Sequence, residues 1–401
     1  MNKLLTALLF ALAISSCNNA SKDSAKEKAE PIQTTNLKEL QSPADTASAE
    51  PYLFTDKNGL VYLSWIEKKM GTFTNEQWSQ PMIISSGDNW FVNWADYPLV
   101  AADGANNLIA HYLEKSEQGK YTYDVKITTS GDAGKTWGIA KVLHNDGKKA
   151  EHGFVSMIPY GDNYFVSWLD GRNSVMEEDG GHSEGHHGQM TIRGAVIDKQ
   201  GNKSNEWELD NRVCDCCQTA AAITENGPVV VYRDRSEQEI RDMSIVRLID
   251  GKWTTPKPIF ADNWKIEGCP VNGPRIDAIG NSMAVAWFTS PDKNAQVNIV
   301  FSKDGGATFN SPLRIDEGKG IGRVDVVMLD ENTAVVSWME GSVIKAVKAY
   351  SNGKKETSFT VAASAESRSS GFPQMTKSGT NLIFSWTDDK SKSIKVASFS
   401  L

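Results

Sequence analysis

The chain has 401 residues, enough for one large domain or two ordinary ones, and its formal net charge is −8. An acidic balance without a basic patch argues against nucleic-acid binding through the phosphate backbone. The 12 tryptophans and 32 glycines indicate many short strands and tight turns rather than a helical body.

The N-terminus carries an export signal. A lysine followed by an apolar run too short to span a bilayer predicts a signal peptide over residues 1–16. Cys17 directly follows two serines, which resembles the lipobox of bacterial lipoproteins and implies that Cys17 is lipidated. The alternative is a plain secretory signal with an incidental cysteine. Residues 17–48 predict a flexible tether, which leaves residues 49–401 for the folded domain. We expect the protein in the cell envelope, on the periplasmic or surface side of the outer membrane, with the lipid as its only membrane anchor.

A short apolar strand that ends in an aromatic residue recurs along the rest of the chain. The aromatic residues are Trp65, Tyr112, Trp168, Tyr232, Trp287, Trp338 and Trp386, at spacings of 47, 56, 64, 55, 51 and 48 residues. Four short strands in each unit of about 50 residues are typical of propeller blades. The sequence therefore predicts an all-β propeller of mostly four-stranded antiparallel blades, with seven candidate blades and six as the alternative. Residues 32–37 are a candidate for the outer strand that the last unit lacks.

Two turns, at residues 130–137 and 302–309, fit the pattern Ser-x-Asp-x-Gly-x-Thr-aromatic. They resemble the Asp-box, or BNR repeat, of bacterial sialidases. An aspartate can accept hydrogen bonds from its own turn, and a glycine tolerates positive φ there. We expect each turn between the third and fourth strands of its blade, in a structural role.

The resemblance implies a sialidase-like propeller that binds an acidic glycan or another small anionic ligand. If such a protein is an enzyme, it is an exo-sialidase-like glycoside hydrolase. The Arg-Ile-Pro motif of sialidases is missing near the first blade, so binding without hydrolysis stays open.

The polar residues gather at one predicted mouth of the channel. Strands of a blade alternate in direction, so the segments leading into first strands share a mouth with the links between second and third strands. The resemblance to sialidases implies a tyrosine nucleophile, a carboxylate base and an aspartate acid/base. The candidates are Asp96, Tyr97, Asp234 and Glu239, with Glu151 and Tyr232 as alternatives.

Arginines at the same mouth offer planar forks that match a carboxylate. The residues predicted to bind the ligand are Arg172, Arg233, Arg235, Arg241, Asn272, Arg323 and Asp325. The alternative is a salt-bridge network that fixes long loops.

Four cysteines, Cys214, Cys216, Cys217 and Cys269, fall before the first strands of two adjacent units. Disulfides form in exported proteins, so these residues predict bridges that pin the two blades together. The alternative is a thiolate site for copper or zinc, with His152 as a further ligand. The alternative function is a non-catalytic propeller whose cysteine cluster binds copper or zinc, or forms disulfides, and supports a partner-binding surface. No other cofactor is predicted.

Overall fold

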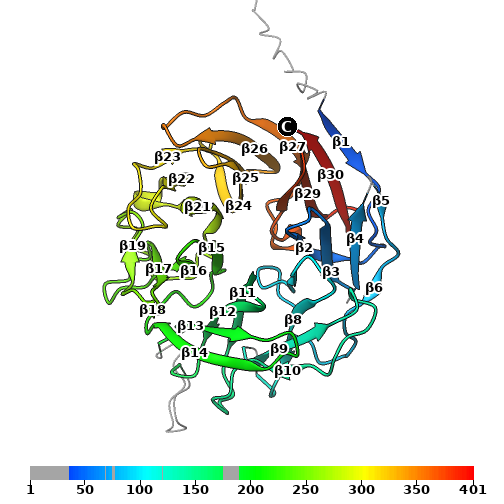
Figure 1. Cartoon of the computed structure of the whole chain (residues 1–401). Helices are drawn as coiled ribbons and strands as arrows, with labels where there is room; N and C mark the ends of the chain where they lie inside the picture. The colour runs from blue at the N-terminus through cyan, green and yellow to red at the C-terminus, as the bar shows by residue number, and fades with distance from the viewer. Residues whose placement is uncertain (1–35, 68, 75–76, 120, 175–188) are drawn as a thin grey trace, which may run out of the picture. The chain divides into compact units, whose positions relative to one another are not determined.

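Seven antiparallel sheets follow one another in chain order around a ring in the computed structural model of the protein (Figure 1). The structure describes residues 36–67, 69–74, 77–119, 121–174 and 189–401. All of these residues belong to one unit, Thr34–Leu401. The predicted signal peptide, Cys17 and the first part of the predicted tether lie outside the described residues. The prediction of an all-β propeller is confirmed, and the sheets number seven rather than six.

The first strand of a blade lies nearest the centre of the ring, and later strands lie further out (Figure 1). Blades one and two consist of β2 (Ala49–Thr55), β3 (Val61–Ile66), β4 (Lys69–Thr74), β5 (Gln77–Trp78), β6 (Met82–Ile83), β7 (Val100–Ala102), β8 (Leu108–Lys115), β9 (Tyr123–Ser130) and β10 (Lys141–Val142). Blades three and four consist of β11 (His152–Tyr160), β12 (Asn163–Asp170), β13 (Thr191–Ile197), β14 (Lys203–Asp210), β15 (Ala220–Thr224), β16 (Gly227–Arg233), β17 (Met243–Ile249), β18 (Lys252–Trp253) and β19 (Lys257–Pro258).

The last three blades complete the ring. They consist of β20 (Arg275–Ile279), β21 (Ser282–Thr289), β22 (Gln296–Ser302), β23 (Leu313–Arg314), β24 (Gly320–Asp330), β25 (Thr333–Glu340), β26 (Val343–Tyr350), β27 (Phe359–Ala363), β28 (Gln374–Ser378), β29 (Asn381–Asp388), β30 (Ser393–Ser400) and β1 (Leu37–Leu40). The described residues also form two short 3-10 helices, η1 (Pro291–Lys293) and η2 (Arg368–Ser370). Neither helix in this part of the chain has the length and apolar character that crossing a bilayer requires.

The recurring aromatic residue lies in the second strand of every blade. These strands are covered by neighbouring blades on both faces, so they are continuous apolar runs rather than alternating ones. Trp65, Trp168, Trp287 and Trp338 each expose 1% or less of their surface. The repeat in the sequence therefore marks the core of the fold.

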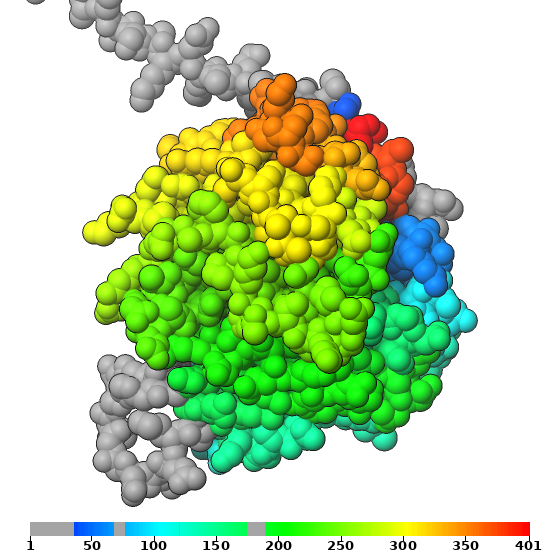
Figure 2. All heavy atoms as spheres, turned by 60° about the vertical axis from the view of Figure 1, so that its left-hand side comes forward, coloured from blue at the N-terminus to red at the C-terminus, as the bar shows by residue number. Residues whose placement is uncertain are grey.

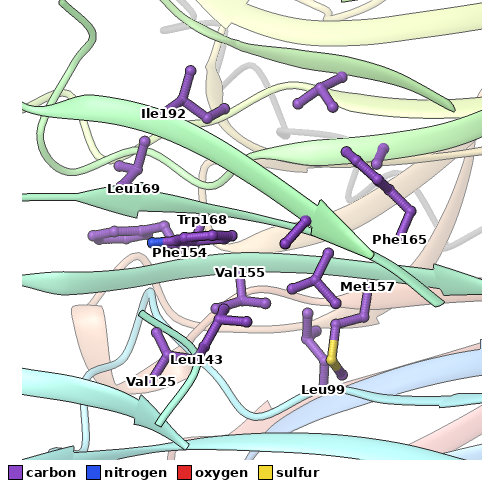
Figure 3. Packing of buried hydrophobic residues seen from close by; sticks show 14 of the residues in the cluster. Leu99, Val125, Leu143, Phe154, Val155, Met157, Phe165, Trp168, Leu169 and Ile192 are labelled. Atoms are coloured by element: carbon purple, nitrogen blue, oxygen red, sulfur yellow. The ribbon is translucent and has the colours of Figure 1, made fainter. Parts of the chain in front are cut away.

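Apolar side chains join each blade to the next, as the interface between blades two and three illustrates (Figure 3). Leu99 and Val125 of blade two face Val155 and Met157 of β11, with Trp168 of β12 beyond them. Burial of such surface is the main favourable term in folding. Farther round the ring, the surfaces of blades four and five adjoin in the green and yellow part of Figure 2. The inner strands of these two blades, β15 and β20, also contact each other.

An N-terminal strand closes the ring. β1 pairs antiparallel with β30 of the last blade, with Leu37 opposite Phe399 and Leu40 opposite Val396. The predicted closing strand is therefore real, but it begins at residue 37, where the prediction ended. β1 lies within the predicted tether of residues 17–48, so the fold begins before residue 49. Leu40 is buried, which explains why this segment joins the sheet rather than staying solvated.

Both Asp-containing turns lie where the sequence places them, between β9 and β10 and between β22 and β23. Asp132 accepts hydrogen bonds from the backbone N–H of Thr136 at 2.9 Å and from its hydroxyl at 2.6 Å. Asp304 and Thr308 repeat both contacts at the same distances. Each carboxylate therefore holds its own turn.

Candidate functional site

A cavity of about 560 Å³ lies at the centre of the ring between the inner strands. Arg275 is a cation in its wall. The Arg275 guanidinium contacts the hydroxyl of Tyr97, and lies 3.4 Å from Oε1 of Gln374 and 4.0 Å from Oδ1 of Asp325. Arg275 therefore already has partners on three sides.

The carboxyl groups of this cavity join neighbouring inner strands. Asp277 of β20 accepts a hydrogen bond from the N–H of Met328 in β24 at 2.6 Å. Asp325 of β24 accepts one from the N–H of Met375 in β28 at 2.7 Å. Burial raises the pKa of Asp277 to about 6. Asp277 and Asp325 therefore hold the inner wall together.

A second pocket, of about 190 Å³, lies where the segments before β7, β11, β15 and β20 meet. We call it the mouth pocket. Its wall carries aromatic rings, carboxyl groups, thiols and a guanidinium, contributed by Trp94, Tyr121, Phe154, Glu151, Asp215, Cys216, Cys269 and Arg368. Reactive and recognising groups are thus denser here than in the central cavity.

An aromatic ring and two guanidinium groups hold the indole ring of Trp94 in place. It stacks on Phe372 with ring centroids 5.5 Å apart. The guanidinium carbon of buried Arg323 lies 5.0 Å from the indole centroid, and that of exposed Arg368 lies 5.9 Å away. Cations over an aromatic face are attracted by its quadrupole. The half-buried ring is therefore a rigid platform in the pocket wall.

Three acids lie close together beneath the mouth pocket. The hydroxyl of Tyr123 donates a hydrogen bond of 2.8 Å to Glu151, and burial raises the pKa of Glu151 to about 8. Asp96 accepts a 2.9 Å hydrogen bond from the N–H of Phe154, and burial raises the pKa of Asp96 to about 7. Burial and the charge of Asp96 likewise raise the pKa of Glu50. At neutral pH, Glu151 therefore holds its proton.

The thiols form a compact group beside the same pocket. Cys214 Sγ lies 3.9 Å from Cys216 Sγ and 3.6 Å from Cys217 Sγ, and all four described cysteines are free. Arg241 donates to Cys214 Sγ at 3.2 Å. Burial alone would raise the pKa of Cys214, but hydrogen bonds from Cys216 and Cys217 and the charge of Arg241 hold it well below its usual range.

Two of the predicted ligand-binding arginines are engaged by the protein itself. The Arg233 guanidinium is fully buried and donates to the backbone carbonyls of Asn272, Arg241 and Phe288. The Arg323 guanidinium donates to the Ser370 hydroxyl and to the carbonyls of residues 366, 367 and 371. Neither fork is open to a ligand in this structure.

The other predicted ligand-binding arginines form ion pairs. Arg172 pairs with Asp170 and Glu206, Arg235 with Asp215 and Glu239, and Arg241 with Glu239. Asn272 and Asp325 join neighbouring blades through backbone contacts, since Asn272 accepts the N–H of Arg323 at 2.7 Å. This geometry matches the alternative prediction, a salt-bridge network that fixes long loops.

The predicted catalytic set is not assembled into one site. Tyr97 contacts Arg275, and Asp234 accepts a hydrogen bond from the Ser244 hydroxyl at 3.1 Å. Glu239 is paired with arginines, as described above. The alternative tyrosine, Tyr232, donates to Asp210 at 2.7 Å. Beside the mouth pocket, it is Tyr123 that donates a hydrogen bond to a glutamate, Glu151.

His152 lies apart from the thiols, between blades two and three. Its ring stacks on that of His144 with centroids 3.5 Å apart, and its Nε2 lies 2.9 Å from Oδ2 of Asp146. Burial, followed by the charge of His152, lowers the pKa of His144. The structure therefore places His152 in a carboxylate–histidine cluster rather than beside the cysteines.

Sequence reasoning missed Trp94, Tyr123 and Arg368. Trp94 lies two residues before the candidate Asp96, so its position before β7 was a usable signal. Arg368 precedes β28 in the same manner. Tyr123 gave no signal, because it lies at the start of a third strand and reaches Glu151 across a blade boundary.

No family model matches the sequence, and no curated protein matches it. Among solved structures, a protein of unknown function from Dyadobacter fermentans is 12% identical, with a TM-score of 0.51 over 80% of this chain and 97% of that chain. An ulvan lyase of polysaccharide lyase family PL25 is 11% identical, with a TM-score of 0.50 over 76% of this chain and 79% of that chain.

A sialidase of Streptococcus pneumoniae is 9% identical and covers 85% of this chain and 83% of that chain, with a TM-score of 0.47. At identities this low, similarity to the first two structures shows a shared fold. It says nothing about which residues act.

Proposed function

We propose that the protein binds an acidic carbohydrate in the mouth pocket. The observation that carries the proposal is the half-buried indole of Trp94 beside the exposed guanidinium of Arg368. Arg368 pairs with no carboxylate in the part of the chain that the structure describes, so its fork can receive one from a ligand. The flat face of a sugar fits an aromatic platform flanked by a few polar groups.

Two further observations support a carbohydrate. Glu151 and Asp215 line the pocket and offer hydrogen-bond partners for sugar hydroxyls. The ulvan lyase, which shares the fold, acts on a polysaccharide according to its description. Relative to the sequence prediction, the ligand keeps its class, but its anionic group meets Arg368 rather than Arg233 or Arg323.

The test is a binding assay with acidic and neutral oligosaccharides of matched length. We expect the acidic series to bind and the neutral series to bind at least about tenfold more weakly, a difference of about 1.4 kcal/mol. Arg368→Ala should remove this preference. Arg314→Ala, a change of an exposed arginine on the outer strand β23, is the matched control and should leave binding unchanged. Equal binding by the wild type and Arg368→Ala would contradict the proposal.

Glycoside hydrolysis is the second candidate, because the pocket holds two carboxyl groups in different environments. Glu151 keeps its proton at neutral pH, as its pKa of about 8 requires. Asp215 instead forms an ion pair with the Arg235 guanidinium at 3.3 Å. An acid and a carboxylate in one pocket are what glycoside hydrolysis needs. If hydrolysis occurs, Glu151→Gln should abolish turnover and leave binding intact; turnover by that variant would exclude Glu151 as the acid.

We also propose that the protein is exported and anchored in the cell envelope through a lipid on Cys17. The proposal rests on the predicted signal peptide and the small residues before that cysteine. The lipidated protein should partition into a detergent phase, and Cys17→Ser should move it to the aqueous phase. A Cys17→Ser variant that still enters the detergent phase would argue against the anchor.

A further inference from the structure

The proposed carbohydrate site does not use the four thiols beside it. We propose that Cys214, Cys216, Cys217 and Cys269 together bind one thiophilic d10 metal ion, Zn²⁺ or Cu⁺, through their sulfur atoms. The metal site goes beyond the carbohydrate proposal and does not depend on it.

The spacing of the sulfur atoms fits a metal site better than a disulfide. Cys214 Sγ lies 3.9 Å from Cys216 Sγ and 3.6 Å from Cys217 Sγ. A disulfide requires about 2.05 Å between sulfurs. Four sulfurs placed tetrahedrally about 2.3 Å from a zinc ion are about 3.8 Å from one another. The observed separations match the second value, and the three sulfurs lie within 4.8 Å of one another.

The backbone brings the fourth cysteine to this group. The N–H of Cys214 donates to the carbonyl of Arg233 at 3.0 Å, which fixes the turn before β15. The segment that carries Cys269 packs against the same turn because residue 273 is a glycine. A Cβ at position 273 would lie 2.1 Å from the carbonyl oxygen of Gln218. The backbone N–H of Gly273 donates a hydrogen bond of 2.9 Å to the side-chain oxygen of Gln218. Cys216 and Cys269 both line the mouth pocket, which brings the two segments together there.

Hydrogen-bond donors surround the sulfurs, as they do around thiolate ligands. Arg241, whose side chain is 4% exposed, donates to Cys214 Sγ at 3.2 Å. The N–H of Asn272 donates to Cys217 Sγ at 3.4 Å. The positive charge of Arg241 offsets part of the negative charge that several thiolates bring. An all-sulfur ligand set selects soft Zn²⁺ or Cu⁺ over Mg²⁺ or Ca²⁺, which prefer oxygen.

The first experiment measures metal and thiols on the full-length protein, without chelators. After reduction, the protein is titrated with Zn²⁺ and, in a separate arm, with Cu⁺, each in competition with a chromophoric chelator. We expect one equivalent per chain in at least one arm, with protection of at least three of these thiols from alkylation. No stoichiometric binding in either arm would overturn the proposal. So would a disulfide among these cysteines in protein isolated from the cell envelope.

Substitutions then separate this site from the carbohydrate site. Cys214→Ser should weaken metal binding by more than about 100-fold, since even loss of a supporting outer partner costs 10–100-fold. Cys269→Ser, at an exposed position where refolding is less at risk, should weaken it at least about tenfold. Arg368→Ala is the matched control and should bind the metal as tightly as the wild type.

Unchanged metal affinity in both cysteine variants would contradict the proposed site. If Arg368→Ala loses carbohydrate binding but binds the metal as the wild type does, the two sites are independent of each other.

Discussion

At the scale of single residues, the acids in and beneath the mouth pocket have raised pKa values. Glu151 and Asp96 are buried acids whose pKa values are raised to about 8 and about 7. Buried acids with raised pKa values in a cleft mark a candidate functional site. Both groups favour the folded state when protonated, which makes their contribution to stability depend on pH.

The pH dependence has a defined sign. The folded protein binds the Glu151 proton more tightly than the unfolded chain, so this stabilisation is complete below pH about 4.5 and is lost as pH rises through about 8. We expect the free energy of unfolding to fall as pH rises from about 4.5 to about 8, and Glu151→Gln to flatten that slope. Urea unfolding at each pH provides the measurement. An equal slope in the variant would show that Glu151 does not keep its proton.

The buried arginines are structural, and their removal should show in stability rather than in binding alone. Arg233→Ala leaves three interior carbonyls without their donor and removes a guanidinium that lies 4.9 Å from the ring of Trp264. We expect a loss of about 3 to 5 kcal/mol in the free energy of unfolding. Arg368→Ala, an exposed control, should cost less than about 0.5 kcal/mol. Chemical denaturation distinguishes the two, and a mild Arg233→Ala variant would contradict this account.

At the scale of elements, one carboxylate holds each of the two Asp-containing turns, Asp132 between β9 and β10 and Asp304 between β22 and β23. Hydrogen bonds from Thr136 lower the pKa of Asp132 to about 2. Its contribution to stability is therefore present above its ordinary pKa and is lost as pH falls towards 2. Asp132→Ala should lower the Tm at pH 6, with a smaller difference at pH 3. Lys135→Ala, an exposed change in the same turn, is the control. A difference that does not change with pH would mean that the carboxylate charge is not what holds the turn.

The elements were predictable from the sequence to a greater degree than the site. The aromatic of each second strand recurs because every blade must bury the same strand, so Trp65 and Trp338 report the fold from sequence alone. The pair of Tyr123 and Glu151 crosses a blade boundary, and no local pattern encodes such a contact. The partners of Arg233 and Arg323 are backbone carbonyls, which have no sequence signature. A cluster of arginines in the sequence therefore suggested a ligand site where the structure has internal supports.

At the scale of the whole molecule, the fold depends on the pairing of β1 with β30, which closes the ring. β1 joins the last blade, and Thr46 of the same N-terminal segment forms a further antiparallel bridge to Ser393 of β30. β1 supplies the outermost strand of the last blade, in the radial arrangement of blades that leaves only short edges. The seventh blade is therefore built from both ends of the chain, with three strands from the C-terminal end and one from the N-terminal end.

Weakening that closure should destabilise the entire propeller. Leu40→Ala removes a buried side chain from β1 and should cost about 2 kcal/mol or more. Glu39→Ala alters an exposed neighbour on the same strand and should have little effect. Thermal unfolding followed by near-UV circular dichroism measures both variants. Equal Tm values for Leu40→Ala and the wild type would show that β1 is dispensable.

The central claim, that the mouth pocket is where a ligand binds, is tested most directly by a crystal structure with a bound acidic oligosaccharide. We predict a sugar ring packed on the indole of Trp94, with its carboxylate on the guanidinium of Arg368. A ligand found instead in the central cavity on Arg275, or on an outer surface of the blades, would contradict the account.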